Sequence, residues 1–252
     1  MELQGKRALV TGGGRGIGAA VARALAARGA HVIVSGRARG PLEEVAGEIR
    51  GAAVVCDLGG RAATDAMVAD VTAGGRIDIL VNNAGIAESA PLGDIDDAMW
   101  DRIMELDATA PFRLTRALVP AMVRAGWGRV ITIASNAGLT GYGYSAAYCA
   151  AKHAVVGLTR ALAIDLGRTG VTINAVCPGW VDTDMAAEAV ARIAGKTGRD
   201  EAAARSALTS MTPQRRLIAP AEVAHAVTML CSDDARGIHG QTIVIDGGQV
   251  LK

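Results

Sequence analysis

Residues 7–18 read Arg7-Ala-Leu-Val-Thr-Gly-Gly-Gly-Arg-Gly-Ile-Gly18, in which a short apolar run leads into a loop of glycines. The apolar run predicts a buried strand. Beyond the loop, Ile17, Val21 and Leu25 recur at helical spacing, and the pattern stops at Gly29. The chain therefore begins with a predicted strand, glycine loop and helix, which is the unit from which α/β domains are built.

The glycine loop predicts a site for a dinucleotide. Glycines allow a tight turn and let the backbone approach a pyrophosphate, while the following helix N-terminus offers free N–H groups and positive potential. A glycine loop alone is weak evidence, because a tight turn between strand and helix can need glycine for its own sake. Here the loop lies between a predicted strand and a predicted helix, which is the context that the dinucleotide site requires.

The end of the second predicted strand, His31–Gly36, bears on which dinucleotide binds. An acidic residue there would accept hydrogen bonds from a ribose 2′-hydroxyl and select NAD. This chain has Gly36 followed by Arg37, and Arg15 lies in the glycine loop. Because guanidinium groups suit a 2′-phosphate, we predict a preference for NADP(H). The alternative is that Arg37 is a solvated surface residue and that NAD(H) binds.

Two further predicted strands, in residues 53–57 and 77–85, carry polar residues at their C-terminal ends. The carboxyl ends of the strands form the ligand crevice in an open α/β sheet. We therefore expect Asp57 to meet the adenine amine and residues 83–85 to pack on the adenosine. Asn82 is expected to be structural, with its side chain bonded to backbone between strands.

A second stretch, residues 135–152, carries the predicted chemistry. A β-branched strand at 128–134 precedes it, and the helical spacing that follows predicts one helix holding Tyr148 and Lys152 at i and i+4, on the same face. Glycines between strand and helix let Ser135 meet Tyr148. A phenol has a pKa of about 10 in water. A nearby ammonium lowers that pKa, so Tyr148 could exchange a proton with a carbonyl or carbinol oxygen near neutral pH.

The rest of the chain continues the alternation of helices and strands. Residues 96–124 predict one long helix with a kink at Pro111. Residues 171–177 predict a strand, and residues 220–230 predict a helix that precedes a last strand at 241–248.

Length and composition indicate one domain that covers residues 1–252. A chain of this length buries roughly 75% of its unfolded surface and needs no disulfide or metal for stability. No linker, internal repeat or low-complexity segment divides it. Residues 184–213 are Ala-rich, charged and weakly helical, and we expect them to form a mobile lid over the crevice.

Composition also narrows the classes of partner. The formal net charge is +1 without a dense basic cluster, so nucleic acid is not expected. The 4 cysteines lie far apart, without ligand spacing, so we expect reduced thiols and no metal site. The N-terminus lacks a signal-peptide core and no apolar run approaches the length of a membrane span, which predicts a cytoplasmic protein without a membrane segment.

Together these residues resemble the motifs of the short-chain dehydrogenase/reductase family over essentially the whole chain. The motifs are Thr11-Gly-x-x-x-Gly16-x-Gly18, Asp57, Asn82-Asn-Ala-Gly85, Ser135, Tyr148-x-x-x-Lys152, Pro178-Gly179 with Thr183, and Asp246-Gly-Gly248. The resemblance implies a single-domain Rossmann fold, an α/β architecture with a doubly wound seven-stranded parallel sheet, helices on both faces and a nicotinamide cofactor. It also implies homo-oligomers, usually tetramers, built from the two long helices and the C-terminal region.

The resemblance further implies roles for individual residues. Tyr148 would be the catalytic acid in reduction and the base in oxidation, Ser135 would hold the substrate oxygen, and Lys152 would bind the nicotinamide ribose and lower the pKa of Tyr148. Residues 178–183 would grip the nicotinamide carboxamide. The residues expected to bind the cofactor are Gly12, Arg15, Gly16, Ile17, Gly18, Arg37, Asp57, Leu58, Asn83, Ala84, Gly85, Tyr148, Lys152, Pro178, Gly179, Val181 and Thr183.

One catalytic position departs from the family pattern. Members usually carry an Asn where this chain has Asp107, and that Asn helps to hold a water that relays protons to the lysine. The backbone carbonyl, which does much of this work, is retained by Asp107. An ionised carboxylate accepts hydrogen bonds but cannot donate them, and it could pair with Lys152 and shift proton affinities. We include Asp107 among the expected catalytic residues.

The substrate is the least specified part of the prediction. Within the family, the chain most resembles reductases of 3-oxoacyl thioesters and polyketides, so we expect an NADPH-dependent carbonyl reductase that is reversible as a secondary-alcohol dehydrogenase. The alternatives are a catabolic NAD(P)+-dependent secondary-alcohol dehydrogenase and a non-enzymatic nucleotide-sensing protein. The expected pocket residues flank the chemistry in sequence and are Asn136, Ala137, Leu139, Tyr142, Tyr144, Trp180 and Met185.

Overall fold

Parallel strands form a single seven-stranded sheet in the order β3-β2-β1-β4-β5-β6-β7 in the computed structural model, which describes residues 2–250. Every neighbouring pair runs parallel. The strand order reverses between β1 and β4, which is the switch point at which open α/β sheets bind ligands. The doubly wound sheet predicted from the sequence is confirmed. The strands are β1 Arg7–Thr11, β2 His31–Gly36, β3 Ala52–Val55, β4 Ile79–Asn82, β5 Gly128–Ile133, β6 Val171–Pro178 and β7 Thr242–Ile245.

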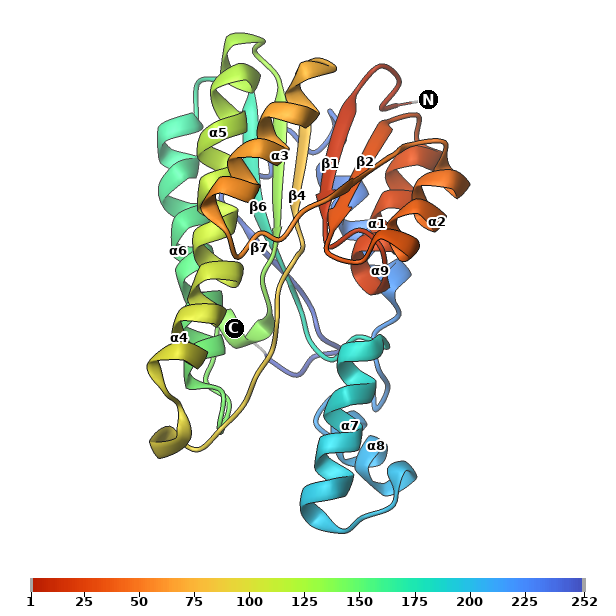
Figure 1. Cartoon of the computed structure of the whole chain (residues 1–252), viewed down its shortest axis with the longest axis vertical. Coiled ribbons are helices and arrows are strands. Elements are labelled where there is room, and N and C mark those ends of the chain that lie inside the picture. Colours follow the sequence, from red (N-terminus) through yellow and green to blue (C-terminus); the bar gives the residue numbers. More distant parts are fainter. Residues whose placement is uncertain (1, 251–252) are drawn as a thin grey trace.

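Helices cover both faces of this sheet (Figure 1). Successive side chains of β1 point to opposite faces and meet different helices. Ala8 and Val10 belong to the core cluster that includes α1 and α9, whereas Leu9 belongs to the cluster that includes α3 and α5. Both faces of the strand are therefore apolar and buried, as parallel sheets require. The helices that cover the two faces are α1 Gly16–Ala27, α2 Arg39–Ile49 and α9 Pro220–Leu230 on one side and α3 Arg61–Ala73, α5 Ala110–Arg124 and α6 Ala146–Leu166 on the other.

The predicted long helix at 96–124 is interrupted, and the prediction of a kink at Pro111 is wrong in its detail. Helix α4 (Asp97–Met104) passes into a π-helical turn, η2 (Glu105–Thr109), before α5 begins. Pro111 lies in the first turn of α5, where a missing N–H costs nothing. The irregularity therefore precedes the proline. The π turn contains Asp107, and such turns frequently occur at functional sites.

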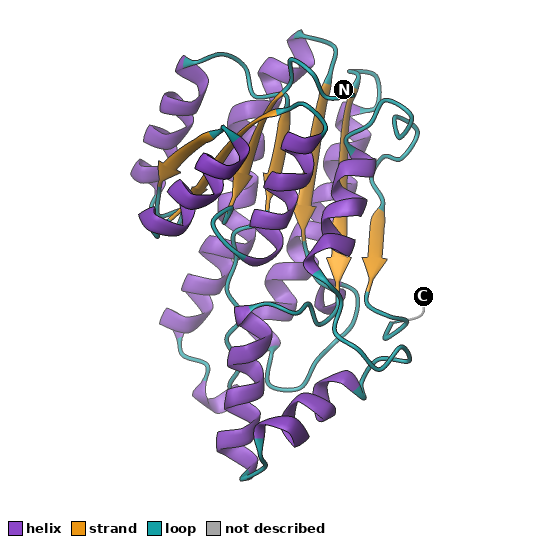
Figure 2. Cartoon of the chain, turned by 90° about the vertical axis from the view of Figure 1, so that its right-hand side faces the viewer, coloured by secondary structure: helices purple, strands orange, loops and turns teal. Residues whose placement is uncertain are grey.

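Two helices project beyond the carboxyl ends of the strands. They are α7 (Asp184–Thr197) and α8 (Glu201–Thr209), at the bottom of Figure 1. In Figure 2 the arrowheads of the strands point toward this end of the molecule. Val190 and Leu208 join the two helices in a small apolar cluster of their own. The stretch predicted as weakly helical thus forms a defined helical pair next to the crevice.

Candidate active site

The glycine loop after β1 is shaped by close contacts that only glycine allows. Gly12 and Gly16 have φ values of +63° and +53°, which L side chains rarely adopt. A Cβ at Gly18 would lie 2.1 Å from the Gly12 carbonyl oxygen, so α1 could not pack on the loop with any larger residue there. Within the described chain, no side chain caps the N-terminus of α1 and no acidic residue lies in its first turn. Its N–H groups are therefore available to an anion such as a pyrophosphate.

The turn after β4 is tied to the glycine loop by Asn83. The Asn83 side chain donates to the carbonyl oxygens of Thr11 and Gly12, at 2.9 and 3.2 Å. The Thr11 hydroxyl accepts from the backbone N–H groups of Asn83 and Ala84, both at 3.0 Å. Asn82 instead donates to two hydroxyl groups, those of Thr115 and Thr132. The expectation that Asn82 bonds backbone between strands is wrong, because Asn83 makes that connection.

The region expected to hold the adenosine end of a cofactor is open and rich in guanidinium groups. Arg37 is exposed directly after β2. Arg15 is exposed as well, but it pairs with Asp184 at the start of α7, at 3.2 Å, a contact that the sequence did not reveal. Asp57 is exposed and accepts the N–H of Gly59 at 3.0 Å, while Leu58 beside it is buried. Exposed ion pairs contribute little, so Arg15 can exchange its partner for a phosphate.

The segment after β6 arches back to the glycine loop. A Cβ at Gly179 would lie 2.7 Å from the Cβ of Asp246, so the backbone there packs directly against the segment that follows β7. Val181 is buried and forms an isolated bridge to Ile218. A Cβ at Gly16 would lie 3.1 Å from the methyl group of Thr183. The segment that begins at Pro178 therefore closes one wall of the crevice that starts at the glycine loop.

Lys152 is held at the bottom of the crevice by two acceptors. Its ammonium donates to the Ile133 carbonyl oxygen, at the end of β5, over 3.3 Å. It also lies 3.1 Å from Oδ2 of Asp107, with side-chain exposures of 6% and 0% for the two residues, so the ion pair is buried. The other oxygen of Asp107, Oδ1, accepts the backbone N–H of Ile86 at 2.9 Å. The π turn thus directs the carboxylate of Asp107 at the lysine.

Ser135 and Tyr148 lie next to this pair. Ser135 follows β5, and its hydroxyl oxygen accepts the N–H of Ala137 at 3.1 Å. Tyr148 lies in the first turn of α6, and the Lys152 ammonium lies 5.5 Å from the centroid of its ring. The Ser135 side chain lies within hydrogen-bonding range of the phenol and acts to lower the pKa of Tyr148. Phenol, ammonium and hydroxyl thus lie near one another, and their catalytic roles stay a prediction.

The net pKa shift of Tyr148 is opposite to the shift predicted from the sequence. Burial raises its pKa most strongly, Lys152 lowers it, Asp107 raises it and Ser135 lowers it, and the outcome is a pKa above the ordinary value. The ammonium acts in the expected direction, but burial outweighs it. Tyr148 is consequently a protonated phenol at neutral pH, which is the form that can donate a proton.

The ion pair has its own balance of burial and charge. Burial alone lowers the pKa of Lys152, but the charges of Asp107 and Tyr148 bring it above its ordinary value. Burial raises the pKa of Asp107, and Lys152 together with the Ile86 N–H opposes that rise. Lys152 therefore remains an ammonium at neutral pH. Each partner offsets part of the cost of burying the other.

The residues expected to line a substrate pocket differ in exposure. Asn136 and Ala137 are buried, so they present no open wall, and Trp180 packs against the α7–α8 cluster. Tyr144 and Met185 are exposed. Ala90 connects the loop after β4 to this region, because its N–H donates to the Tyr144 carbonyl oxygen at 2.8 Å.

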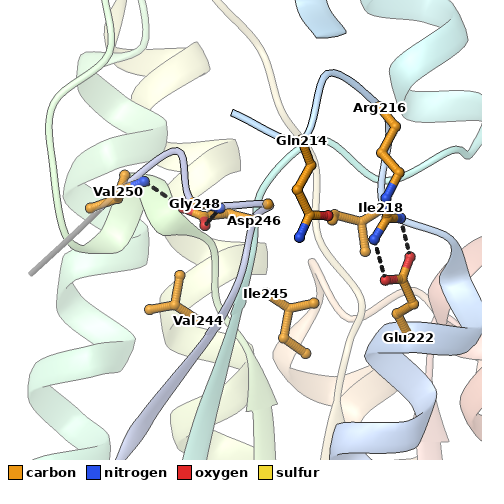
Figure 3. Close-up of a pocket in the computed structure, with 10 residues that line it drawn as sticks. Gln214, Arg216, Ile218, Glu222, Val244, Ile245, Asp246, Gly248 and Val250 are labelled. Atoms are coloured by element: carbon orange, nitrogen blue, oxygen red, sulfur yellow. Dashed lines mark hydrogen bonds and ion pairs between the residues drawn. The ribbon is translucent and has the colours of Figure 1, made fainter. Parts of the chain in front are cut away.

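A separate cavity of about 390 Å³ lies beside β7 (Figure 3). Its lining includes Asp246, Gln214 and the ion-paired side chains of Arg216 and Glu222. Ser135, Tyr148 and Lys152 do not line it.

Residues 2–250 contain no group of three or more His, Cys, Asp or Glu that could hold a metal ion. None of the helices in this range has the length and apolar content of a membrane span.

Comparisons with known proteins agree with this geometry. A family model described as enoyl-(acyl carrier protein) reductase matches residues 12–249. The D-beta-hydroxybutyrate dehydrogenase of Cupriavidus necator is 38% identical over 99% of this chain and 100% of its own length. The 3-oxoacyl-[acyl-carrier-protein] reductase FabG of Escherichia coli is 35% identical over the full length of both chains.

Two further relatives carry polyketide names. The granaticin polyketide synthase putative ketoacyl reductase 1 of Streptomyces violaceoruber is 39% identical over 96% of this chain and 92% of its own. A solved structure of a single-residue variant of the actinorhodin polyketide ketoreductase with NADPH superposes with a TM-score of 0.93 at 36% identity, over 97% of each chain. The similarity thus extends over the whole crevice and over the α7–α8 pair beside it.

Proposed function

Because the chain belongs to the short-chain dehydrogenase/reductase family, we propose that it is an NADPH-dependent reductase of ketones. The observation that carries this proposal is the meeting of Ser135, Tyr148 and Lys152 at the carboxyl edge of the sheet, beside a loop shaped for a pyrophosphate. A hydroxyl and a protonated phenol side by side can bind a carbonyl oxygen and supply the proton that its reduction requires.

The cofactor fits the residues that are present. The free N–H groups at the start of α1 suit the pyrophosphate, and Arg15 and Arg37 suit a 2′-phosphate without a competing carboxylate at the end of β2. NADPH would supply the hydride to the carbonyl carbon. Residues of the segment from Pro178 to Thr183 would hold the nicotinamide end, since this segment arches over the glycine loop.

The chain's own residues would handle the oxygen and its proton. The Ser135 hydroxyl donates a hydrogen bond to the carbonyl oxygen and fixes its position, and Tyr148 transfers its phenolic proton to that oxygen. Lys152 remains charged beside the phenol and stabilises the phenolate that forms. It also binds the ribose hydroxyls of the cofactor. The raised pKa of Tyr148 keeps the phenol protonated at neutral pH, which is the form that reduction requires.

The names of the relatives point to a substrate class. Both 3-oxoacyl and beta-hydroxybutyrate describe an oxygen on the third carbon of an acyl chain, as a ketone in one and as an alcohol in the other. We therefore propose a 3-oxoacyl thioester, a polyketide or a similar ketone as substrate. Oxidation of the corresponding secondary alcohol is the reverse reaction in the same site. A nucleotide sensor without activity would not need Ser135, Tyr148 and Lys152 together.

The proposal extends to the surroundings of the site. Helices α7 and α8 would act as a substrate lid, because they stand over the carboxyl ends of the strands and Arg192 reaches across to Ser89, at 3.0 Å. A homotetramer, or a dimer, would cover apolar side chains that stand exposed on α4, α5 and α6, namely Trp100, Phe112 and Ile164. The whole assembly would be cytoplasmic.

The test is a panel of ketones, thioesters and alcohols, followed by the absorbance of the reduced nicotinamide with NADPH and with NADH. We expect 3-oxoacyl thioesters or related ketones to be reduced, and NADPH to be preferred. The absence of turnover with every ketone in the presence of a cofactor that binds would refute the proposed reaction.

A further inference from the structure

The motif Asp246-Gly-Gly248 has no part in the reaction described above. The carboxylate of Asp246 is buried and accepts the backbone N–H groups of Gly248, Gln249 and Val250, at 3.0, 3.1 and 2.8 Å. Figure 3 shows Asp246 with Gly248 and Val250 beside it. Gly247 and Gly248 have φ values of +67° and +84°, which let the chain curl around the carboxylate. The segment after β7 is thus wrapped around one buried charge.

A further contact of this carboxylate leads to the active site. The side-chain amide of Asn136, the residue after Ser135, donates to Oδ2 of Asp246 at 3.3 Å and to Oε1 of Gln249 at 3.0 Å. Both oxygen atoms lie on one side of the carboxamide. Because an ionised carboxylate can only accept, it determines which end of the carboxamide carries the NH₂ group. The oxygen of Asn136 must therefore point the other way.

The oxygen of Asn136 faces the Ser135 hydroxyl. Ser135 donates to it over 3.5 Å, a long bond that a carbonyl oxygen of the substrate can replace. A flipped carboxamide would instead aim its NH₂ group at the Ser135 oxygen, which already accepts the N–H of Ala137. That group would compete with the phenol of Tyr148 for the remaining lone pair of the hydroxyl.

We propose that Asp246 is a positioning residue that fixes the Asn136 carboxamide and, through it, aims the Ser135 hydroxyl at the substrate carbonyl. This inference rests on the proposed ketone reduction only for the role of Ser135. It makes the segment after β7, in particular Gln249, part of the support of the catalytic hydroxyl.

The test compares Asp246→Asn with wild type. Asparagine keeps the shape and the packing on Gly179. Each oxygen of Asp246 accepts two N–H donors, so the NH₂ group of the asparagine meets two donors in either orientation, and the four hydrogen bonds around the carboxylate cannot all persist. Loss of the hydrogen bond between the Asn136 amide and the charged Asp246 predicts a fall in kcat of about tenfold. The affinity for NADPH, measured by fluorescence titration, should change by less than about twofold, which is much smaller than the expected tenfold fall in kcat.

Two controls separate positioning from general damage. Glu222→Gln removes another carboxylate of the same cavity, one that likewise accepts a backbone N–H, that of Ala219 at 2.7 Å, and pairs with Arg216. It should lower the melting temperature while kcat stays at the wild-type value. In an Asn136→Ala background, Asp246→Asn should cause little further loss of kcat.

Wild-type kcat in Asp246→Asn, or an equal loss in the Asn136→Ala background, would overturn the proposal. If Asp246→Asn does not fold, Gln249→Met carries the same test, because it removes only the second acceptor of the Asn136 amide. A wild type that reduces no ketone would defeat the proposed reaction alone. The orientation of the Ser135 side chain in crystal structures of wild type and Asp246→Asn would still decide the inference, and an unchanged orientation would overturn it.

Discussion

Replacing Asp107 by Asn should move the pH dependence of ketone reduction toward lower pH. The substitution introduces an amide of nearly the same shape, and it keeps an oxygen for the Ile86 N–H. It removes the negative charge 3.1 Å from the Lys152 ammonium, a distance at which two unit charges interact by about 5 kcal/mol at an effective dielectric constant of 20.

The net change in the free energy of the Lys152 ammonium is smaller than this Coulomb attraction. Burial of the two ions offsets part of it, so a net loss of about 3 kcal/mol for Lys152 is a reasonable magnitude. Such a loss would lower the pKa of Lys152, because the Asp107 charge is what raises it against burial. The Asp107 charge also raises the pKa of Tyr148, so its removal lowers that pKa too. Reduction needs the protonated phenol, and its rate will therefore decline at a lower pH than in wild type.

The assay is the initial rate of NADPH-dependent reduction across a series of buffers, for wild type and Asp107→Asn. Glu105→Gln is the matched control, because Glu105 lies in the same π turn but pairs with Arg113, outside the crevice. The control should keep the wild-type profile. An Asp107→Asn profile that coincides with wild type would show that the carboxylate has no electrostatic role in the reaction.

Three other predictions test the cofactor site and the ion pair. Gly18→Ala should weaken NADPH binding by about tenfold or more, because the added Cβ would lie 2.1 Å from the Gly12 oxygen. Gly47→Ala is the control and should leave the affinity unchanged, because the space around Gly47 is open. Isothermal titration measures both affinities. Arg37→Asp should shift the ratio of kcat/KM from NADPH toward NADH by about tenfold or more, and an unchanged ratio would remove Arg37 from the 2′-phosphate site. Lys152→Met should lower the free energy of unfolding in urea by about 3–5 kcal/mol, because it leaves the Asp107 carboxylate buried without its cation. The double variant with Asp107→Leu should regain most of that loss. Additive losses from the two substitutions would contradict a coupled pair.

The strands were predictable because both faces of a parallel sheet are buried, which leaves continuous apolar runs in the sequence. β1 and β2 begin and end as predicted. Helices α2 and α3 were not individually identified. Their buried positions, such as Leu42 and Val45 in α2, are few and are separated by charged and small residues, so the helical period is weak.

The active site was predictable as a set of residues but not as an electrostatic arrangement. The i and i+4 spacing was enough to place Tyr148 and Lys152 together. The sign of the Tyr148 pKa shift depends on burial, which sequence spacing does not show. The π turn was not predicted either, and its carboxylate bonds to Ile86, which belongs to another segment of the chain. Asn136 and Asp246 meet across 110 positions, so their link required the structure.

The central claim is that Tyr148 delivers the proton to a ketone oxygen in a site that binds NADPH. Turnover of Tyr148→Phe with NADPH and a ketone that wild type reduces tests this claim most directly. Since a positioned acid contributes about 10²–10⁴-fold, we predict that kcat falls by that factor while NADPH affinity stays close to wild type. Turnover near the wild-type rate in this variant would contradict the account.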